Sequence, residues 1–179
     1  MIYLTYLLIA MNTMSQPISF NFNQLNNNQI MIVNDSVMGG KSNSNFEMNQ
    51  QTIQFSGEVS LKNNGGFASL RMLWPFQVED YFNQIQLKLI GDGKLYQFRL
   101  RTNSGYDGAA YVYEFQTTKD KEMTIKFDIG NFVPSFRGRT LTNMPELNLT
   151  DVKQMGFLIA DKQTGKFTLK IKSITLINQ

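Results

Sequence analysis

The sequence of 179 residues contains no cysteine and no histidine. The absence of cysteine excludes disulfide bonds and thiolate metal sites. The absence of histidine excludes Ser-His-Asp and Cys-His catalysis, the commonest general base near neutral pH, and every histidine-based metal site. A zinc ion would have to bind through carboxylates alone, which is unusual in proteins. We therefore expect no catalytic residue, no metal and no cofactor.

Clustered charge and long apolar runs are also lacking. The net charge is +3, and the basic residues are spread from Lys41 to Lys172 without forming a block. Because nucleic-acid surfaces usually carry a clustered basic stripe, nucleic acid is not an expected partner. The apolar run at residues 1–11 is too short to span a bilayer as a helix, so we do not expect a transmembrane protein.

The N-terminal segment, residues 1–14, is separated from the predicted fold. A secretory signal has a positively charged residue before its apolar run and a cleavage site of small residues. Here no Lys or Arg precedes the apolar run, and no such cleavage site is clear. It is either an atypical signal peptide or the result of a misassigned start, with translation beginning at Met11 or Met14. A signal peptide would place the protein in the periplasm; otherwise the cytoplasm is favoured. Residues 15–179 form a single domain, long enough to bury about 70% of its unfolded surface.

Apolar and polar residues alternate with period two along most of this domain, which predicts β-strands. Strands recur at spacings of roughly 10 to 14 residues with Gly, Asn and Asp between them, which favours an all-β sandwich. No window predicts a long helix, although residues 149–152 fit one helical turn. Gly91-Asp92-Gly93 predicts a hairpin turn. The clearest strand patterns lie at residues 18–22, 52–61, 66–72, 84–89, 95–101, 111–115, 123–127 and 166–172.

Three sequence blocks stand close together between residues 34 and 71. The first and last each contain a Gly-Gly pair after small polar residues, Gly39-Gly40 and Gly65-Gly66. Glycine suits positions where φ is positive or where another backbone passes closely, and Asn and Asp before it can hold a tight turn. The middle block, residues 55–61, alternates as a strand, and its Gly57 predicts a bulge or a close approach. We expect two specially shaped loops flanking one strand.

These blocks resemble the hallmark of the complex I intermediate-associated protein 30 family, which runs approximately D-x-V-M-G-G-x-S, F-S-G-x-x-S-L and N-N-G-G-F-A-S-x-R. The resemblance continues through residues 91–96, 132–139, 155–161 and 165–171, and covers roughly residues 17–177. It implies a galactose-binding-like β-sandwich of jelly-roll type and an assembly or binding role rather than a reaction. Mitochondrial members act as assembly factors for respiratory complex I. The Asn/Gln/Ile/Lys-rich composition and the lack of an Arg-rich presequence favour a bacterial relative.

Arginines on predicted strand faces are the main candidates for binding. Arg99 and Arg101 share a face with Gln97, and Arg71 alternates outward on its own strand. Such a face can hold a carboxylate, a phosphate or a sugar acid through forked hydrogen bonds. A solvated outer face with weak surface ion pairs is an equally weighted alternative. The single tryptophan, Trp74, suits carbohydrate stacking or a protein contact if exposed, but a partly buried edge position is favoured.

The loops supply further candidates. The Asp35 loop can cradle an anion or offer oxygen ligands to calcium, but a turn held by Asp35 is the favoured interpretation. The loop containing Asn64 is either a hairpin connection or the rim of a binding surface. Arg137 is predicted to anchor its loop against the sandwich, and Arg139 to be free for contact. Gly39, Gly40, Gly65 and Gly66 are predicted to shape these loops.

Carboxylate catalysis is a less favoured alternative. A β-sandwich can host glycoside hydrolysis with two acidic residues, but no spacing in this sequence brings two of them together. The candidates are Asp35, Glu58, Glu79, Asp80, Glu114 and Asp161.

Two functions remain open. The first is a non-catalytic assembly factor or chaperone-like adaptor that binds a protein, with respiratory and other membrane-associated complexes among the candidate partners. The second is a carbohydrate- or small-anion-binding module that uses Arg71, Arg99, Arg101 and Trp74. A concave pocket containing those arginines would favour the second function, whereas a flat apolar patch would favour the first.

Overall fold

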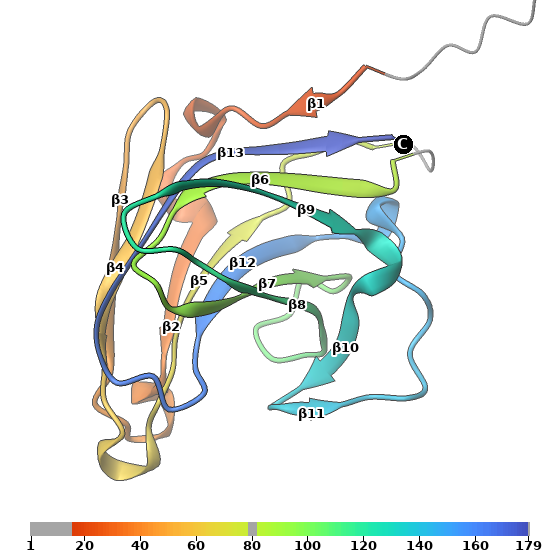
Figure 1. The fold of residues 1–179 in the computed structure, drawn as a ribbon. Coiled ribbons are helices and arrows are strands. Elements are labelled where there is room, and N and C mark those ends of the chain that lie inside the picture. The colour runs from red at the N-terminus through yellow and green to blue at the C-terminus, as the bar shows by residue number, and fades with distance from the viewer. Residues whose placement is uncertain (1–15, 79–81, 179) are drawn as a thin grey trace, which may run out of the picture.

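The computed structural model describes residues 16–78 and 82–178, and the predicted segment 1–14 lies outside the described residues. Two antiparallel sheets face each other across one core (Figure 1). The prediction of an all-β jelly-roll sandwich is therefore confirmed. None of the described helical turns has the length and apolar character needed to cross a membrane.

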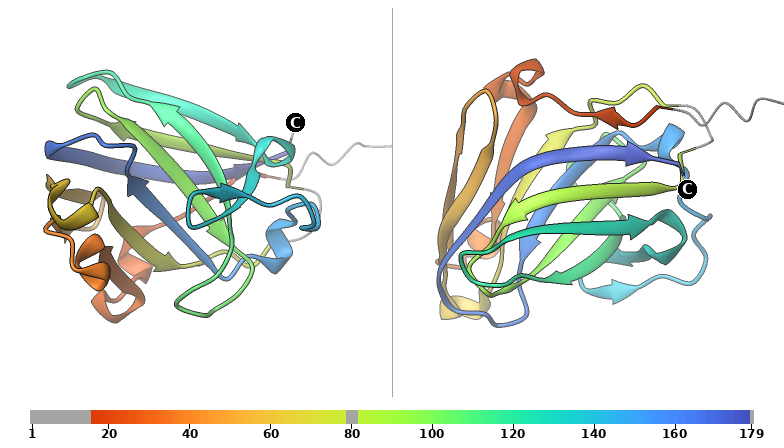
Figure 2. Two further views of the ribbon diagram at one scale, coloured as in Figure 1. Left: turned by 90° about the horizontal axis from the view of Figure 1, so that it is seen from below. Right: turned by 45° about the horizontal axis from the view of Figure 1, so that its top comes forward.

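The first sheet contains six of the described strands, in the order β3-β4-β13-β6-β9, with β1 paired to β13. The long strand β13, violet-blue in Figure 2, lies between β4 and β6 and pairs with both. A register shift between Ile171 and Ser173 lets it change partners along its length. The strands span Ile18–Ser19 (β1), Asn43–Met48 (β3), Ile53–Val59 (β4), Gln84–Ile90 (β6), Glu122–Asp128 (β9) and Gly165–Ile177 (β13).

The second sheet contains the seven other described strands, in the order β11-β10-β8-β7-β12-β5-β2. Its interior strand β12 is buried along its whole length, on both faces. The strands span Ile30–Asn34 (β2), Ala68–Leu73 (β5), Leu95–Arg101 (β7), Ala110–Gln116 (β8), Val133–Phe136 (β10), Arg139–Thr140 (β11) and Gln154–Ile159 (β12).

Aromatic side chains join the two sheets in the core. Phe127 of the first sheet stacks on Phe98 of the second, with ring centroids 5.3 Å apart, and also contacts Phe115 at 5.7 Å. Phe98 in turn packs on Phe157 at 5.2 Å. The inward residues of β7, which alternate with Gln97, Arg99 and Arg101, thus build the core, and the arginines are left on the outer face.

The hairpin predicted at Gly91-Asp92-Gly93 is wrong, because β6 and β7 belong to different sheets. The turn instead carries the chain across the sandwich. Asp92 holds it in place by accepting hydrogen bonds from the Tyr96 hydroxyl at 3.1 Å and from the backbone N–H of Thr168 at 2.9 Å. The hairpin interpretation of residues 63–66 fails for the same reason, since they connect β4 to β5 in the other sheet.

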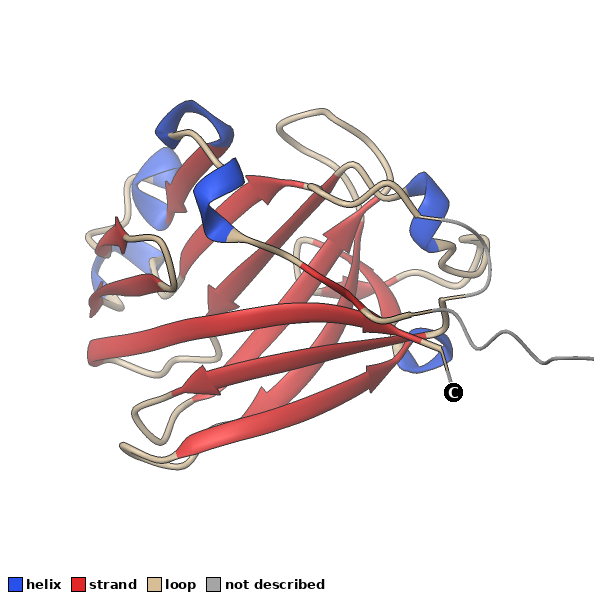
Figure 3. Ribbon diagram, turned by 90° about the horizontal axis from the view of Figure 1, so that it is seen from above, coloured by secondary structure: helices blue, strands red, loops and turns tan. Residues whose placement is uncertain are grey.

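The helical content described is limited to short 3₁₀ turns, blue in Figure 3. The single turn predicted near residue 150 is confirmed, and Asn148 caps it by accepting a hydrogen bond from the N–H of Thr150. The strand predicted at residues 18–22 is shorter than expected. The six turns span Phe22–Gln24, Asn27–Gln29, Asp35–Met38, Lys62–Asn64, Ile129–Asn131 and Leu149–Asp151.

Gly57 allows a close approach of β3 to β4, since the pairing of these strands continues through it without a bulge. A β-carbon at Gly57 would lie 2.2 Å from the carbonyl oxygen of Asn43. We therefore expect Gly57→Ala to lower the free energy of unfolding by about 2 kcal/mol, because the backbone would have to move. A thermal melt should show a decrease in Tm of about 4–8 °C. The adjacent substitution Ser56→Ala is the control; equal melting of the two variants would contradict this account.

Candidate functional site

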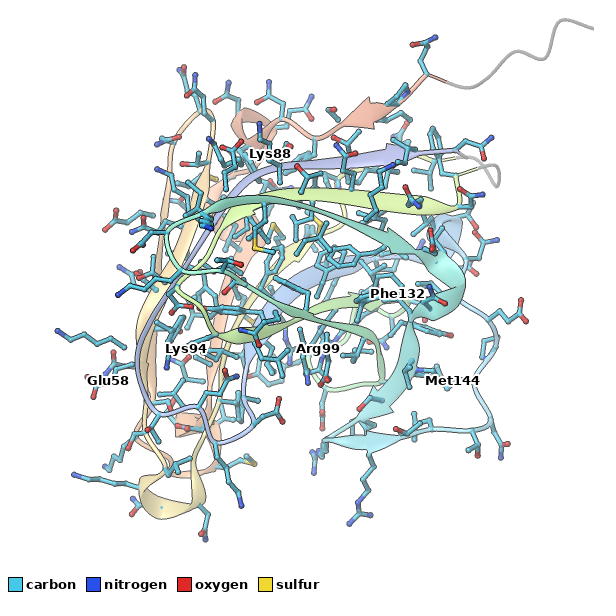
Figure 4. All side chains as sticks on the ribbon, in the orientation of Figure 1. Glu58, Lys88, Lys94, Arg99, Phe132 and Met144 are labelled. Carbon is cyan, nitrogen blue, oxygen red and sulfur yellow. The ribbon has the colours of Figure 1, made fainter. Side chains whose placement is uncertain are left out.

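Three arginines lie together on the outer face of the second sheet. Gly156 of β12 pairs with Arg71 of β5 on one side and with Arg99 of β7 on the other. Paired residues of neighbouring strands project to the same face, so Arg71 and Arg99 flank a residue without a side chain. Arg101 lies two residues further along β7, on the same face, opposite Gln154. We call Arg71, Arg99 and Arg101 the arginine floor; Arg99 is labelled in Figure 4.

Gly156 cannot be replaced by a larger residue without a shift of the backbone. A β-carbon at this position would lie 2.3 Å from the carbonyl oxygen of Leu70. The glycine therefore keeps β5 and β12 close together and leaves the space between the two flanking arginines open. Sequence reasoning did not identify Gly156 as part of a site, because it stands in a strand that is otherwise mostly apolar.

The arginine floor lies in a groove of about 1160 Å³. This volume is slightly above the usual range for small-molecule pockets, so the groove can hold a ligand with several functional groups. Polar side chains beside the floor include Gln97 and Glu114, which are joined by a hydrogen bond of 2.8 Å. Apolar lining residues come from β2, β8, β10, β12 and the turn after β2: Val33, Val112, Val133, Leu158, Val37 and Met38.

The donors of the arginine floor are poorly satisfied within the described chain. Arg71 donates to the carbonyl oxygen of Tyr106 at 2.5 Å and lies over its ring, 5.5 Å from the centroid. The buried Nε of Arg71 and of Arg99 have no acceptor among the described residues. Arg101 is only 3% exposed, and both its Nε and its Nη1 lack an acceptor there. Buried donors without partners cost free energy, so this arrangement is unfavourable in the free protein.

Burial and mutual repulsion act on these guanidinium groups. Burial, with a further contribution from the charge of Arg71, lowers the pKa of Arg99 to about 10. Burial, together with the charges of Arg71 and Arg99, lowers the pKa of Arg101 to about 9, while Asp107 opposes this shift. Arginine stays protonated at neutral pH in either case. The lowered pKa values therefore indicate positive charges that an incoming anion would stabilise.

The loop between β7 and β8, residues 102–109, borders the floor. It lies next to the β10–β11 hairpin, because Asp107 forms an ion pair of 2.5 Å with Arg137. Arg137 has a positive φ of 49° and also lies over the ring of Phe136, 5.1 Å from its centroid. Arg137 thus ties its hairpin to the neighbouring loop at an exposed position, whereas Arg139 is exposed and does not line the groove.

Asp35 lies beneath the other end of the groove, with its carboxylate fully buried. Oδ1 accepts a hydrogen bond from the N–H of Ser42 at 2.9 Å. Oδ2 accepts from the Ser42 hydroxyl, from the N–H of Gly66 at 2.6 Å and from the N–H of Phe67 at 3.3 Å. We call these contacts the Asp35 network. It joins the first and third sequence blocks into one structural unit.

The Gly-Gly pairs close over this carboxylate. A β-carbon at Gly40 would lie 2.3 Å from atoms of the Asp35 side chain, and one at Gly65 would lie 2.5 Å from its Oδ2. The other member of each pair, Gly39 or Gly66, has a positive φ of 86° or 138°. Each pair thus supplies one residue that must be small and one that must adopt a left-handed or related conformation.

The Asp35 network does not offer Asp35 to a ligand, since its oxygens accept hydrogen bonds from inside the protein. The network instead holds the turn that carries Val37 and Met38, whose exposed side chains line the groove. Asn63 reinforces it by donating to the carbonyl oxygen of Gly39 at 3.1 Å. Asn64 is exposed, has a positive φ of 58° and does not line the groove.

Trp74 lies outside the groove. It follows β5 and packs on Phe76 with ring centroids 4.8 Å apart. Among the candidate acids, Glu114 and Asp161 line the groove. Glu58 lies elsewhere, and Glu79 and Asp80 fall outside the described residues. The sequence did not indicate Tyr106, Asp107, Val37 or Met38 as groove residues, because exposed loop side chains carry no periodic pattern.

The fold and the groove define a jelly-roll β-sandwich module with a concave, arginine-bearing outer face. The family model described as complex I intermediate-associated protein 30 matches residues 19–171, and the chain belongs to this family. A protein of Schizosaccharomyces pombe described as uncharacterized is 24% identical over 166 residues, which cover 81% of this chain and 76% of the yeast protein.

Two solved structures with the same fold are carbohydrate-binding modules. The family 11 module from Clostridium thermocellum, in complex with a β-1,3-1,4-mixed-linked tetrasaccharide, has a TM-score of 0.65 and 16% identity, covering 90% of this chain and 95% of the module. A low-affinity xylan-binding module from Roseburia intestinalis has a TM-score of 0.54 and 10% identity, covering 92% of this chain and 97% of the module. At these identities the similarity concerns the fold alone.

The Asp35 network makes stability depend on acid pH. Burial raises the pKa of Asp35, but hydrogen bonds from Ser42, Gly66 and Phe67 lower it more, so the folded pKa lies below the ordinary value of 3.8. The resulting stabilisation is complete above the unfolded pKa and is lost as pH falls through the folded pKa. Asp35→Asn should lower the free energy of unfolding by about 2–3 kcal/mol at pH 7.

Urea unfolding of both proteins from pH 6 to pH 2 measures this dependence. The difference between wild type and Asp35→Asn should shrink below about pH 4, as the wild type becomes protonated. Asp120→Asn is a matched control, because Asp120 is exposed and its φ of 56° suits asparagine equally well. A constant difference across the whole pH range would contradict the assigned role of the Asp35 carboxylate.

The unsatisfied arginine floor predicts a stabilising substitution. Arg101→Met keeps most of the side-chain volume but removes a buried positive charge. Two nitrogens of this guanidinium group, Nε and Nη1, have no acceptor among the described residues. We expect it to raise the free energy of unfolding by about 1 kcal/mol, measured by urea titration. The exposed Arg139→Met should change it by less than about 0.5 kcal/mol. A lower free energy of unfolding for Arg101→Met would instead show that Arg101 stabilises the fold.

Proposed function

We propose that the chain is a non-catalytic binding module that takes an acidic ligand into the groove of the second sheet. The observation that carries this proposal is the arginine floor, in which Arg99 and Arg101 have buried donors without acceptors in the described chain. A groove containing these arginines is the geometry that favours anion recognition over a flat contact surface.

An acid group in the groove would remove two unfavourable features at once. Guanidinium groups form paired, charge-assisted hydrogen bonds with carboxylate or phosphate oxygens, which would supply acceptors to the floor. The negative charge would also offset the repulsion among Arg71, Arg99 and Arg101, which contributes to the lowered pKa values of Arg99 and Arg101. The groove is thus prepared for an anion before it binds.

The residue inventory supports binding rather than catalysis. With no histidine and no cysteine in the chain, a reaction would have to rely on carboxylates. Glu114 and Asp161 line the groove, but Glu114 is engaged by Gln97 and Asp161 stands in the turn after β12. Membership of a family described by its association with a complex I intermediate also favours a binding role.

A protein adaptor is the second candidate function, and family membership together with the exposed Val37 and Met38 favours it. A carbohydrate is a third source of ligand, since structurally similar modules were solved with a mixed-linked tetrasaccharide or described as binding xylan. A carbohydrate would need an acid group to use the arginine floor. Whether the ligand is a protein or a carbohydrate, an acidic group is the part that the arginine floor would bind.

A titration followed by NMR tests the proposed function, because side-chain Nε–H signals report directly on each arginine. Adding sodium glucuronate to ¹⁵N-labelled protein should shift the signals of Arg99 and Arg101 and leave that of the exposed Arg139 unchanged. Glucose at the same concentration, in matched sodium chloride, is the neutral control. Equal shifts with glucuronate and with sodium chloride alone would show that the floor has no preference for an organic acid.

A further inference from the structure

We propose that the natural ligand of the groove is a short segment of a partner protein. This segment places an Asp or Glu carboxylate on the arginine floor and an apolar side chain against Val37 and Met38. The inference rests on the proposed function and names the source of its acidic ligand.

The first argument is the pair of exposed apolar side chains at the edge of the groove. Val37 is 59% exposed and Met38 is 68% exposed, and both line the same groove as the arginine floor. Met and Arg are enriched at the surfaces that bind other proteins. An apolar edge beside a cationic floor therefore complements a segment that carries both an acid and an apolar residue.

The second argument is that these apolar side chains are held in place. They belong to the turn Asp35–Met38, and the Asp35 network fixes its first residue through Ser42, Gly66 and Phe67. Gly39 closes the turn by donating its N–H to the carbonyl oxygen of Ser36 at 3.1 Å. A fixed contact surface loses little conformational freedom when it binds, which favours affinity.

The third argument is the separation between the two contacts. The backbone N–H of Asp35 donates to the carbonyl oxygen of Phe67 at 3.2 Å, so the turn begins beside Phe67. Arg71 lies four residues further along the same chain segment, and extended chain rises about 3.3 Å per residue, giving about 13 Å. An extended peptide covers this distance in about four residues. The expected motif is thus an acid and an apolar residue about four positions apart.

Two of the aromatic rings that line the groove are less available to a sugar, because an arginine covers one face of each. Tyr106 already has Arg71 over one face of its ring, and Phe136 has Arg137 over one face. Trp74, the single tryptophan of the chain, packs on Phe76 and does not line the groove. The exposed apolar lining thus consists of the aliphatic Val37, Met38 and Val133 and of one aromatic side chain, Tyr106, which has Arg71 over one face of its ring.

A displayed library of random dodecapeptides tests the proposal without assuming a sequence. The full chain is immobilised, and peptides that also bind the Arg99→Gln variant are removed. We expect the retained peptides to be enriched in Asp or Glu with an apolar residue about four positions away. Thermal melts first confirm that each variant is folded. If Arg99→Gln does not fold, Arg99→Lys replaces it, because lysine keeps the charge but loses the forked donors.

A synthetic peptide with the enriched sequence is then measured by fluorescence anisotropy. Its affinity should fall about tenfold or more with Arg99→Gln and with Met38→Ser, since each removes one of the two contacts. Arg139→Gln and Leu73→Ser are the matched controls, because both residues are exposed and neither lines the groove. These two substitutions should leave the affinity unchanged.

The outcomes separate this inference from the proposed function. The proposal of a segment with two contacts would be overturned if the retained peptides are apolar or basic, or if Met38→Ser leaves their affinity unchanged. Either result would leave the proposed anion binding intact. Arg99-dependent binding of uronic-acid oligosaccharides on a glycan array, with no peptide enriched, would assign the groove to an acidic carbohydrate instead. If no peptide and no acidic glycan binds and glucuronate leaves the arginine signals unshifted, the proposed function fails as well.

Discussion

The buried carboxylate of Asp35 is the interaction on which this end of the sandwich depends. Asp35 follows β2 of the second sheet, and its partner Ser42 precedes β3 of the first sheet. Its other partners, Gly66 and Phe67, precede β5 of the second sheet. A buried charge is tolerated only with a full set of hydrogen bonds, so the loops that supply these donors must close together. The shape of the groove edge follows from that requirement.

The sequence predicted the faces of the strands well and their neighbours poorly. Alternation is a local property, so the placement of Arg99 and Arg101 on one face was visible in residues 95–101. The proximity of Arg71 to Arg99 was not, because it depends on β12 inserting between β5 and β7. The wrong hairpin at residues 91–93 has the same origin, since a glycine turn indicates a change of direction but not whether the flanking strands pair.

The two glycine loops illustrate the same limit. The sequence indicated two specially shaped loops flanking one strand. Both Gly-Gly pairs do shape tight connections, but two strands, β3 and β4, lie between them. The loops' shared dependence on Asp35 could not be inferred, because Gly40 and Gly65 lie in two different connections between the sheets, which meet only when the sandwich forms. The resemblance to a family was more informative about the fold than any single pattern. It did not indicate which face of the sandwich is hollowed, which is a property of side-chain burial.

The position of β13 in the chain has a consequence for folding. This strand lies between β4 and β6 and also pairs with β1, yet it follows every other described strand in the sequence. During synthesis, the edges of β4 and β6 that pair with β13 therefore keep unpaired backbone groups until β13 has been made. Such unpaired edges can pair with other chains. Because so many pairings join distant residues, the rate of folding is limited by loop closure. The interval before β13 is available is when the growing chain is most exposed to aggregation.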